Sequence, residues 1–193
     1  NEYNCLFFIA DWHSLTTHPH PENIRNSVRT ILAEYLACGI DPEKATIYVL
    51  SDVPEVVELY LYLNMNAGIG ELMRTASFKD KARQQLHIDR VHTTEGDVER
   101  EIFNEGNKHS VSAGLLTYPT LMAADIIIHK AVKVPVGKDQ EQNMEMARRF
   151  ARRFNATYGV DFFPEPASFY YSHKAVKVPG LDGSGKMGKS EGN

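Results

Sequence analysis

The first third of the chain alternates between short apolar runs and longer stretches of helical periodicity. Residues 6–9 (LFFI) and 47–50 (IYVL) are continuous apolar runs, typical of strands buried on both faces of a parallel sheet. Between them, apolar residues recur at helical spacing from Pro21, a favourable first helical position, until Gly39. Another helix is predicted over 54–66. This order of elements predicts an α/β fold with a parallel sheet and helices on both faces.

The rest of the chain predicts three more helices and one more strand. In order, these are a polar helix over 70–85, an apolar helix over 113–129, a strand over 134–137 and a helix over 139–154. The apolar helix contains Pro119 near its start. Residues 86–110 lose periodicity and become mostly charged, so we interpret 83–110 as an insertion. The tail from residue 162 is rich in proline and glycine and predicts loops.

Composition narrows the class of protein. With 193 residues, 42% hydrophobic and 24% charged, the chain is typical of one globular domain. Its net charge of -4 excludes the whole-chain basic footprint of a dedicated nucleic-acid binder. Cys5 and Cys38 are too few for a disulfide framework and favour a reducing, cytoplasmic setting.

The two ends of the chain and its longest apolar run also narrow the class of protein. The run over 5–10 is far too short to span a membrane, and no basic start of a signal peptide precedes it. The chain begins without methionine and ends in a glycine-rich loop. We therefore expect both ends to be cuts through a larger protein.

The loop over 181–190 (LDGSGKMGKS) is the first candidate for chemistry. Its glycines allow close approach to a ligand, and Lys186 and Lys189 can place two ammonium groups on one polyphosphate. The spacing does not match a Walker A loop. Because such a loop on its own is more often a solvated linker, its context has to decide.

Residues 137–140 (GKDQ) provide that context. They lie at the carboxyl end of the predicted strand over 134–137, where ligands gather in open α/β sheets, and Gly137 would let a nucleotide approach the backbone. The alternative is that Asp139 only caps the following helix.

Tyr118, Met122 and Asp125 are spaced i, i+4, i+7 and therefore share one stripe of the apolar helix. The Asp125 carboxylate is flanked by alanines and isoleucines, and burial without a partner would be costly. A structural salt bridge is one explanation. A flat apolar ligand that donates a single hydrogen bond, such as an indole or a phenol, is the other.

Two further clusters are more simply explained without ligand chemistry. The histidines at 13, 18 and 20 match no zinc spacing, so we expect no metal site, but His13 lies at the same sheet edge as 139–140. A basic cluster near the end of the last helix suits a solvated face, with RNA contact as the alternative; it comprises Arg148, Arg149, Arg152 and Arg153.

Together these motifs resemble the catalytic domain of the class I aminoacyl-tRNA synthetases, and within that class the bacterial-type tryptophanyl-tRNA synthetases. Residues 186–190 (KMGKS) resemble the KMSKS signature, 137–140 the GxDQ nucleotide motif, and 112–125 the tryptophan-pocket helix. Residues 51–55 and 78–81 also match. The resemblance covers nearly the whole chain and implies a Rossmann-like α/β fold.

The resemblance also implies roles for individual residues. Asp125 is expected to accept the indole N–H, with Met122, Val134 and Val136 around the ring and His13, Tyr118 and Gln140 near the α-amino and carboxylate groups. For ATP, it implies that Gly137 and Asp139 hold the adenosine or its metal side and that Val178 and Met187 lie by the adenine. The resemblance also implies that the phosphates are bound by Lys81, Lys186, Lys189 and Ser190. The three lysines are the expected catalytic residues.

The implied reaction is activation of L-tryptophan by ATP with Mg²⁺, followed by transfer to tRNA(Trp). The tryptophan carboxylate attacks the α-phosphate in line, so catalysis is mostly positioning and stabilisation of the departing pyrophosphate. The resemblance further implies a cytoplasmic homodimer with no membrane contact.

The sequence departs from the family pattern in three ways. The family's first strand with its HIGH-type motif and its C-terminal helical anticodon-binding domain are both missing, so we expect the 193 residues alone not to complete the reaction. Gly188 replaces the usual serine of KMSKS, which removes one hydroxyl donor.

Three alternatives remain open at this point. A tyrosyl-tRNA synthetase shares the fold and a similar loop, but would be expected to carry glutamine in the helix where residues 122–125 read MAAD. A non-catalytic synthetase-like module would keep the amino-acid and nucleotide sites without the chemistry. A small-molecule adenylyltransferase has only the fold in its favour.

Overall fold

The computed structural model describes residues 3–16, 20–87, 95–102, 104, 106, 111–170, 179–181 and 183. Their strands are β1 (Leu6–Ile9), β2 (Thr46–Val49), β3 (Lys133–Pro135) and β4 (Ala167–Phe169). Their helices are α1 (Asp11–Ser14), α2 (Pro21–Ala37), α3 (Glu55–Met65), α4 (Ile69–Met73), α5 (Ala76–Gln85), α6 (Glu95–Ile102), α7 (Ala113–Ile127) and α8 (Glu141–Tyr158). Two short 3-10 segments are η1 (Leu50–Asp52) and η2 (Lys138–Gln140).

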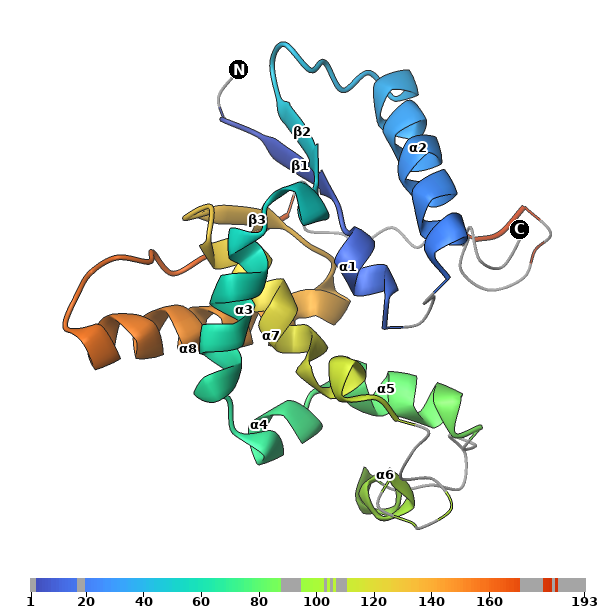
Figure 1. The fold of residues 1–193 in the computed structure, drawn as a ribbon, viewed down its shortest axis with the longest axis vertical. Coiled ribbons are helices and arrows are strands. Elements are labelled where there is room, and N and C mark those ends of the chain that lie inside the picture. Colours follow the sequence, from blue (N-terminus) through green and yellow to red (C-terminus); the bar gives the residue numbers. More distant parts are fainter. Residues whose placement is uncertain are drawn as a thin grey trace.

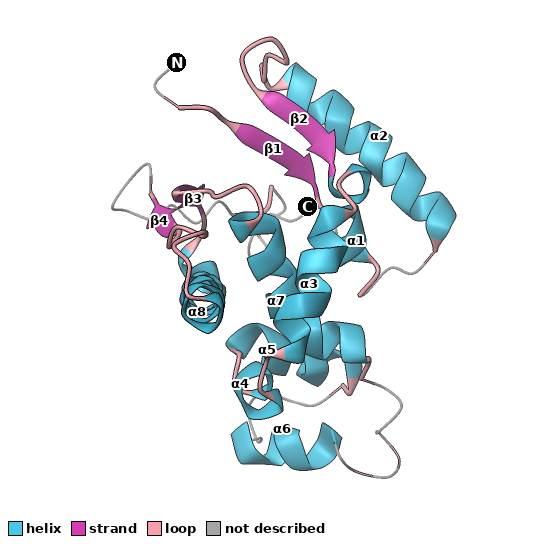
Figure 2. Cartoon of the chain, turned by 60° about the vertical axis from the view of Figure 1, so that its left-hand side comes forward, coloured by secondary structure: helices cyan, strands magenta, loops and turns pink. Residues whose placement is uncertain are grey.

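The strands are parallel, as predicted. β1 pairs with β2 from Leu6 opposite Thr46 to Ile9 opposite Val49, and β3 pairs with β4. Within the described residues these pairs form two separate two-stranded sheets (Figure 2). The 17-residue helix α2 connects β1 to β2, which is the crossover that parallel strands require.

In Figure 1, α2 lies on one side of the β1–β2 sheet, and α3 and α7 lie near the carboxyl ends of its strands. On one face, the ring of Phe7 lies 6.4 Å from the ring of Tyr35 in α2. On the other, Phe8 and Tyr48 pack against the core that α3, α7 and α8 build. Tyr48 Oη also lies 2.6 Å from Nε2 of His129, just after α7. The predicted arrangement of helices around this sheet is therefore confirmed.

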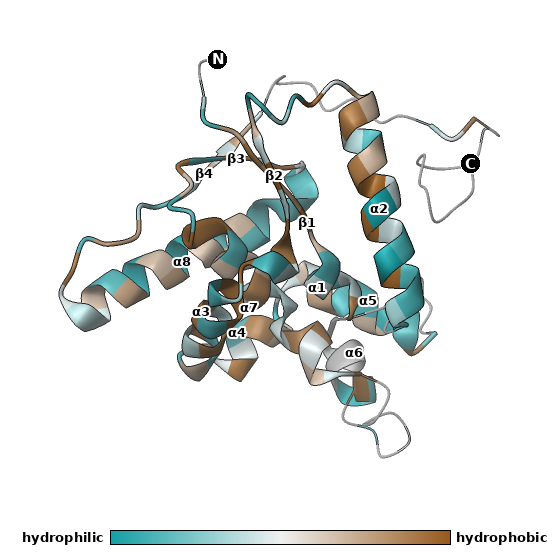
Figure 3. Cartoon of the chain, turned by 45° about the horizontal axis from the view of Figure 1, so that its top comes forward, coloured by the Kyte–Doolittle hydropathy of each residue, from teal (hydrophilic) through white to brown (hydrophobic). Residues whose placement is uncertain are grey.

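The prediction that β1 is buried on both faces is wrong for its first half. Ile9 is buried, but Leu6 and Phe7 are 39% and 37% exposed. Among the described residues β1 has a hydrogen-bonded neighbour on one edge only, and a cavity of ≈ 460 Å³, lined by residues of β1 and β3, adjoins it. The α2 helix is likewise without a buried residue, and brown hydrophobic and teal hydrophilic segments alternate along it in Figure 3.

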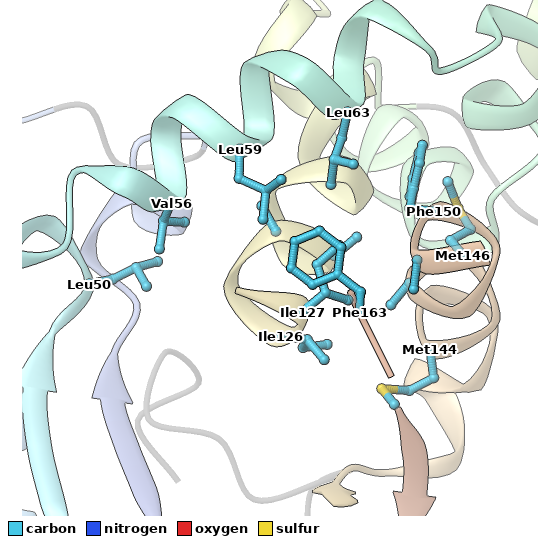
Figure 4. Close-up of a cluster of buried hydrophobic side chains, with 14 of the residues drawn as sticks. Leu50, Val56, Leu59, Leu63, Ile126, Ile127, Met144, Met146, Phe150 and Phe163 are labelled. Atoms are coloured by element: carbon cyan, nitrogen blue, oxygen red, sulfur yellow. The ribbon is translucent and has the colours of Figure 1, made fainter. Parts of the chain in front are cut away.

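The main core lies between α3, α7 and α8. Figure 4 shows apolar side chains from these helices converging, joined by Leu50 before α3 and Phe163 after α8. α7 is apolar on nearly every side because α3 and α8 both pack against it. It begins at Ser112, whose Oγ accepts a hydrogen bond from Leu115 N at 3.2 Å, and it contains Pro119 as predicted.

The helix predicted over 70–85 is broken in two at Thr75. Thr75 has an extended backbone, and its Oγ1 donates to the carbonyl oxygen of Leu72 at 2.8 Å. The side chain of Gln142 in α8 stabilises the break, because its Oε1 accepts from Ala76 N at 2.7 Å and its Nε2 donates to Arg74 O. The polar interpretation of this stretch is also incomplete, since Phe78, Lys79 and Ala82 are buried.

Other boundaries differ by smaller amounts. The helix predicted from Asp139 begins as η2, continues as α8 and ends four residues late, at Tyr158, after which Gly159 has a left-handed backbone. α6 lies inside 83–110, where the pattern predicted no helix, and its Ile102 packs against the small cluster of Phe78 and Leu115. The strand β4 lies in the tail where only loops were predicted. No helix in the described part of the chain has the length and hydropathy that a membrane crossing requires.

Candidate active site

The segments that follow β1 and β2 at their carboxyl ends are held together by a hydrogen bond. α1 follows β1 after one residue and η1 follows β2 immediately. Asp11 Oδ1, at the start of α1, accepts a hydrogen bond from Ser51 N in η1 at 3.1 Å. This bond fixes α1, and with it His13, at the carboxyl edge of the sheet, as the sequence predicted for that residue.

Asp125 is the most deeply buried charged side chain at this edge. It is 3% exposed, and its Oδ2 lies 2.7 Å from Nε2 of His13. Burial raises the pKa of Asp125 from 3.8 to about 6, while the hydrogen bond from His13 opposes this rise. Within the described residues Oδ1 has no hydrogen-bond partner. The first explanation of Asp125, a salt bridge to some partner, therefore holds, and it leaves one buried oxygen able to accept a hydrogen bond from a ligand.

The predicted stripe on α7 is confirmed. Tyr118 Oη lies 3.7 Å from Sδ of Met122 one turn along the helix, and the edge of the His13 ring meets the Tyr118 ring at a centroid distance of 5.3 Å. Burial and the nearby charges of Asp125 and Asp139 raise the pKa of Tyr118. The phenol is therefore a neutral hydrogen-bonding group near pH 7.

Lys81 of α5 joins this group. Its Nζ lies 4.3 Å from the centroid of the Tyr118 ring, in a cation–π contact. Burial lowers the pKa of Lys81. The structure thus brings together the predicted residues Lys81, Tyr118, Met122, Asp125 and His13.

Two cavities flank this group. A cavity of ≈ 460 Å³ is lined by Asp125 together with apolar residues, among them Phe8, Ile126 and Val134. A second, of ≈ 390 Å³, is lined by Tyr118, Trp12 and Tyr60. The walls of the first cavity are mostly apolar, and they also include His129, Lys130 and Lys133 beside the single carboxylate of Asp125. Such a mostly apolar cavity with a few polar groups suits an apolar ligand that carries a polar atom.

Residues 137–140 follow β3 as predicted. A Cβ at Gly137 would collide with Oδ1 of Asp139, so a larger residue there would force the Asp139 carboxylate to move. Asp139 Oδ2 accepts from Gln140 Nε2 at 3.0 Å, and Gln140 Oε1 accepts from Asn143 Nδ2 at 2.9 Å. Asp139 lies in the first turn of η2, where a negative charge is favourable, but it is not the N-cap residue of α8, which is Gln140 and makes no side-chain capping bond. Val136 packs against the core.

The basic cluster is occupied by ion pairs. Glu145 contacts Arg148, Arg149 and Arg152, and Arg148 does most to hold the pKa of Glu145 below its usual value. Glu71 contacts Arg149 and Arg153 across α4 and α8. The structure therefore supports a solvated, ion-paired face for this cluster.

Several predicted residues lie outside the described part of the chain: His18, Val178, Lys186, Met187, Lys189 and Ser190. In the described part, no group of three or more histidine, cysteine or acidic side chains is arranged to hold a metal ion.

Several long-range side-chain pairs were not predicted, and three of them lie on or beside α7. They are His13 with Asp125, Tyr48 with His129, and Tyr60 with Thr117, the last with their hydroxyl oxygens 2.5 Å apart. Each joins residues at least 57 positions apart, so periodicity gives no signal for them. The one available signal was the cost of burying Asp125, which required some partner.

Comparison with known proteins decides the family. The family model of class I tRNA synthetases for W and Y matches residues 1–193. The chain belongs to this family. Membership agrees with the order of elements, the parallel strands and the glycine-containing turn that follows β3.

Individual relatives point to the tryptophan branch. The tryptophan–tRNA ligase of Porphyromonas gingivalis is 72% identical over 193 residues, all of this chain and 52% of that protein. The tryptophan–tRNA ligase of Fusobacterium nucleatum is 40% identical over the same shares. A crystal structure of tryptophanyl-tRNA synthetase from Campylobacter jejuni, complexed with ADP and tryptophan, superposes with a TM-score of 0.76 at 35% identity and covers 96% of this chain and 50% of that one.

These comparisons confirm the Rossmann-like α/β fold class of the synthetases. The chain spans about half the length of the curated relatives that it matches.

Proposed function

We propose that the whole protein activates L-tryptophan with ATP and transfers it to tRNA(Trp). The observation that carries this proposal is the buried Asp125, which lines a mostly apolar cavity of ≈ 460 Å³ and whose Oδ1 has no hydrogen-bond partner among the described residues. The 72% identity to a tryptophan–tRNA ligase supports it, as does the likeness to a synthetase solved with ADP and tryptophan.

For tryptophan, Asp125 accepts the indole N–H. Met122, Val134 and Val136 surround the ring, where their apolar surface excludes water from the bond. Tyr118 and Gln140 bind the α-amino and carboxylate groups. Tyr118, at the α-amino end of the substrate, and Met122, at the indole ring, are neighbours on one face of α7, where Tyr118 Oη contacts Met122 Sδ.

For ATP, Gly137 and Asp139 hold the adenosine or its metal side, and Mg²⁺ enters with the nucleotide. Val178 and Met187 lie by the adenine, and the phosphates are bound by Lys81, Lys186, Lys189 and Ser190. A carboxylate oxygen of tryptophan attacks the α-phosphorus, the bond to the bridging oxygen breaks, and pyrophosphate leaves. The three lysines stabilise the charge that develops on it.

Transfer completes the cycle. A hydroxyl of the terminal ribose of tRNA(Trp) attacks the carbonyl carbon of the adenylate, and AMP leaves. We place the protein in the cytoplasm as a homodimer, in keeping with this tRNA substrate and with its family. We also propose that residues 83–110 are an insertion and that the 193 residues are part of a larger catalytic unit, because the anticodon-reading domain and the HIGH-type motif of the family lie outside them.

Aminoacylation of tRNA(Trp) by the whole protein tests this function. We expect charging with tryptophan and not with tyrosine. Tryptophan binding without adenylate formation would favour the non-catalytic module instead.

The proposed role of Lys189 gives a further prediction. Lys189→Ala is expected to slow adenylate formation about 100-fold or more while changing tryptophan affinity less than about threefold, because the lysine acts on transition-state phosphates. Single-turnover adenylate formation and equilibrium tryptophan binding measure the two effects.

Lys44→Ala is the matched control. Lys44 is exposed, and its ion-pair partner among the described residues is Asp41 on the surface, so this variant should leave both quantities unchanged. Equal losses of adenylate formation and tryptophan binding in Lys189→Ala would contradict the assignment.

A further inference from the structure

We propose that His13 is a positioning residue for Asp125: it holds Oδ2 of the carboxylate so that Oδ1 is left to accept one hydrogen bond from the substrate. In this role His13 determines selectivity for a side chain with an N–H donor without touching that donor. The inference rests on the proposed function, because it concerns the same pocket.

The position of His13 is fixed from several sides. Its helix α1 is tied to η1 by the bond between Asp11 Oδ1 and Ser51 N, and its own carbonyl oxygen accepts from Thr16 Oγ1 at 2.8 Å. Its ring meets Tyr118 edge-on, and its side chain is only 14% exposed. A ring held in this way restricts rotation of the Asp125 carboxylate to which it is bonded.

The chemistry of the pair follows from the 2.7 Å distance between Nε2 and Oδ2. Nε2 must carry a proton to donate to a carboxylate, and such a charge-assisted bond favours the ionised acid. An ionised Oδ1 is the stronger acceptor for an indole N–H, because bonds to charged groups are about twice as strong as neutral ones.

The other titratable groups facing Asp125 supply no positive charge. Tyr48 of β2 lies close enough that burial and the Asp125 charge raise its pKa to about 12, and its hydroxyl is bonded to His129. Tyr118 also has a raised pKa, from burial first, then from the charges of Asp125 and Asp139. Burial lowers the pKa of His129. Both phenols therefore stay neutral near pH 7, and within the described residues His13 is the group that offsets the burial of Asp125.

The test compares two ligands in the whole protein. One is tryptophan, and the other is its analogue with a sulfur atom in place of the indole N–H, 3-benzothienylalanine. The wild type should bind tryptophan at least about tenfold more tightly, since hydrogen bonds to charged groups have effects of this size. His13→Ala should reduce this ratio of affinities to about threefold or less, chiefly because it weakens the binding of tryptophan.

Two variants make the result specific. His13→Gln keeps an N–H donor near the position of Nε2 and should restore most of the preference. His20→Ala removes an exposed histidine close in sequence and should behave as the wild type. The ratio compares two ligands on one protein. If part of the His13→Ala protein fails to fold, binding of both ligands falls by the same factor and the ratio does not change.

The pH dependence separates positioning from a merely structural role. Tryptophan binding to the wild type should weaken as pH falls through about 6, because the acceptor becomes protonated. Without His13 the same loss should begin at a higher pH, because the effect of burial on the pKa of Asp125 is then unopposed. Binding of the sulfur analogue should not show this step.

Two results overturn the inference, and they are distinguishable. An equal loss of both ligands in His13→Ala with an unchanged pH midpoint would place His13 at the α-amino or carboxylate group, as the sequence predicted. A wild type that binds tryptophan no better than the sulfur analogue would overturn the role of Asp125, and the positioning role with it.

Discussion

Asp125→Asn in the whole protein is expected to lower kcat/KM for tryptophan in adenylate formation by about 10- to 150-fold, the range for losing a hydrogen bond to a charged group. The amide keeps the size of the side chain but replaces the charged acceptor and must also orient its oxygen toward the indole. kcat/KM for tryptophan relative to tyrosine, measured for both proteins, gives the change in selectivity. Unchanged selectivity would contradict the assignment of Asp125.

The same substitution, which lowers kcat/KM, should raise the free energy of unfolding. Burial raises the pKa of Asp125 above its unfolded value, so the native state binds more protons between about pH 4 and 6. The ionised carboxylate therefore destabilises the fold as pH rises through this range, by on the order of 3 kcal/mol for a shift of about two units. Asparagine has no such titration.

Urea unfolding of both proteins across this pH range measures the effect. The carboxyl groups of Asp41 and Glu145, whose pKa values are lowered by their Lys44 and Arg148 partners, contribute a slope of opposite sign, but they are the same in both proteins. The difference in unfolding free energy should grow in favour of Asp125→Asn as pH rises. Parallel curves would show that the buried acid does not titrate in this way.

The second large effect is expected at Phe150. Its ring is 2% exposed in α8 and lies in the core between α3, α7 and α8 (Figure 4). Phe150→Ala should destabilise the fold by about 3–5 kcal/mol, because it removes a large buried side chain and leaves a cavity. A thermal or urea unfolding midpoint measures the loss.

Tyr158→Ala provides the matched comparison. Tyr158 is an aromatic residue at the end of the same helix, but it is 58% exposed. Its replacement should cost no more than about 1 kcal/mol, since it removes little buried surface. Similar losses for both variants would mean that α8 does not depend on the core packing of Phe150.

Elements set by local pattern could be predicted from the sequence. β1, α2 and α7 have the predicted ranges to within two residues, because a four-residue apolar run, Pro21 at a helix start and a long apolar helix are each local signals. The break at Thr75 could not be predicted, because Gln142 stabilises it from 66 residues away. The burial of β1 was overestimated, because an apolar run does not reveal how many neighbours a strand has.

The site was predictable to a similar degree. The stripe of Tyr118, Met122 and Asp125 followed from helical spacing, and the turn at Gly137 followed from its place after a strand. The pairing of His13 with Asp125 could not be derived, since 112 residues separate them and only the fold brings their atoms to 2.7 Å. The contact of Lys81 with Tyr118 depends in the same way on how α5 packs against α7.

Pyrophosphate exchange into ATP by the whole protein, with tryptophan and tyrosine supplied separately, tests the central claim most directly. It reports adenylate formation alone and needs no tRNA. Exchange that depends on tryptophan and is absent with tyrosine is the predicted result. Exchange with tyrosine alone would mean that Asp125 accepts a phenol and that the tryptophan assignment is wrong, and no exchange with either would contradict synthetase activity altogether.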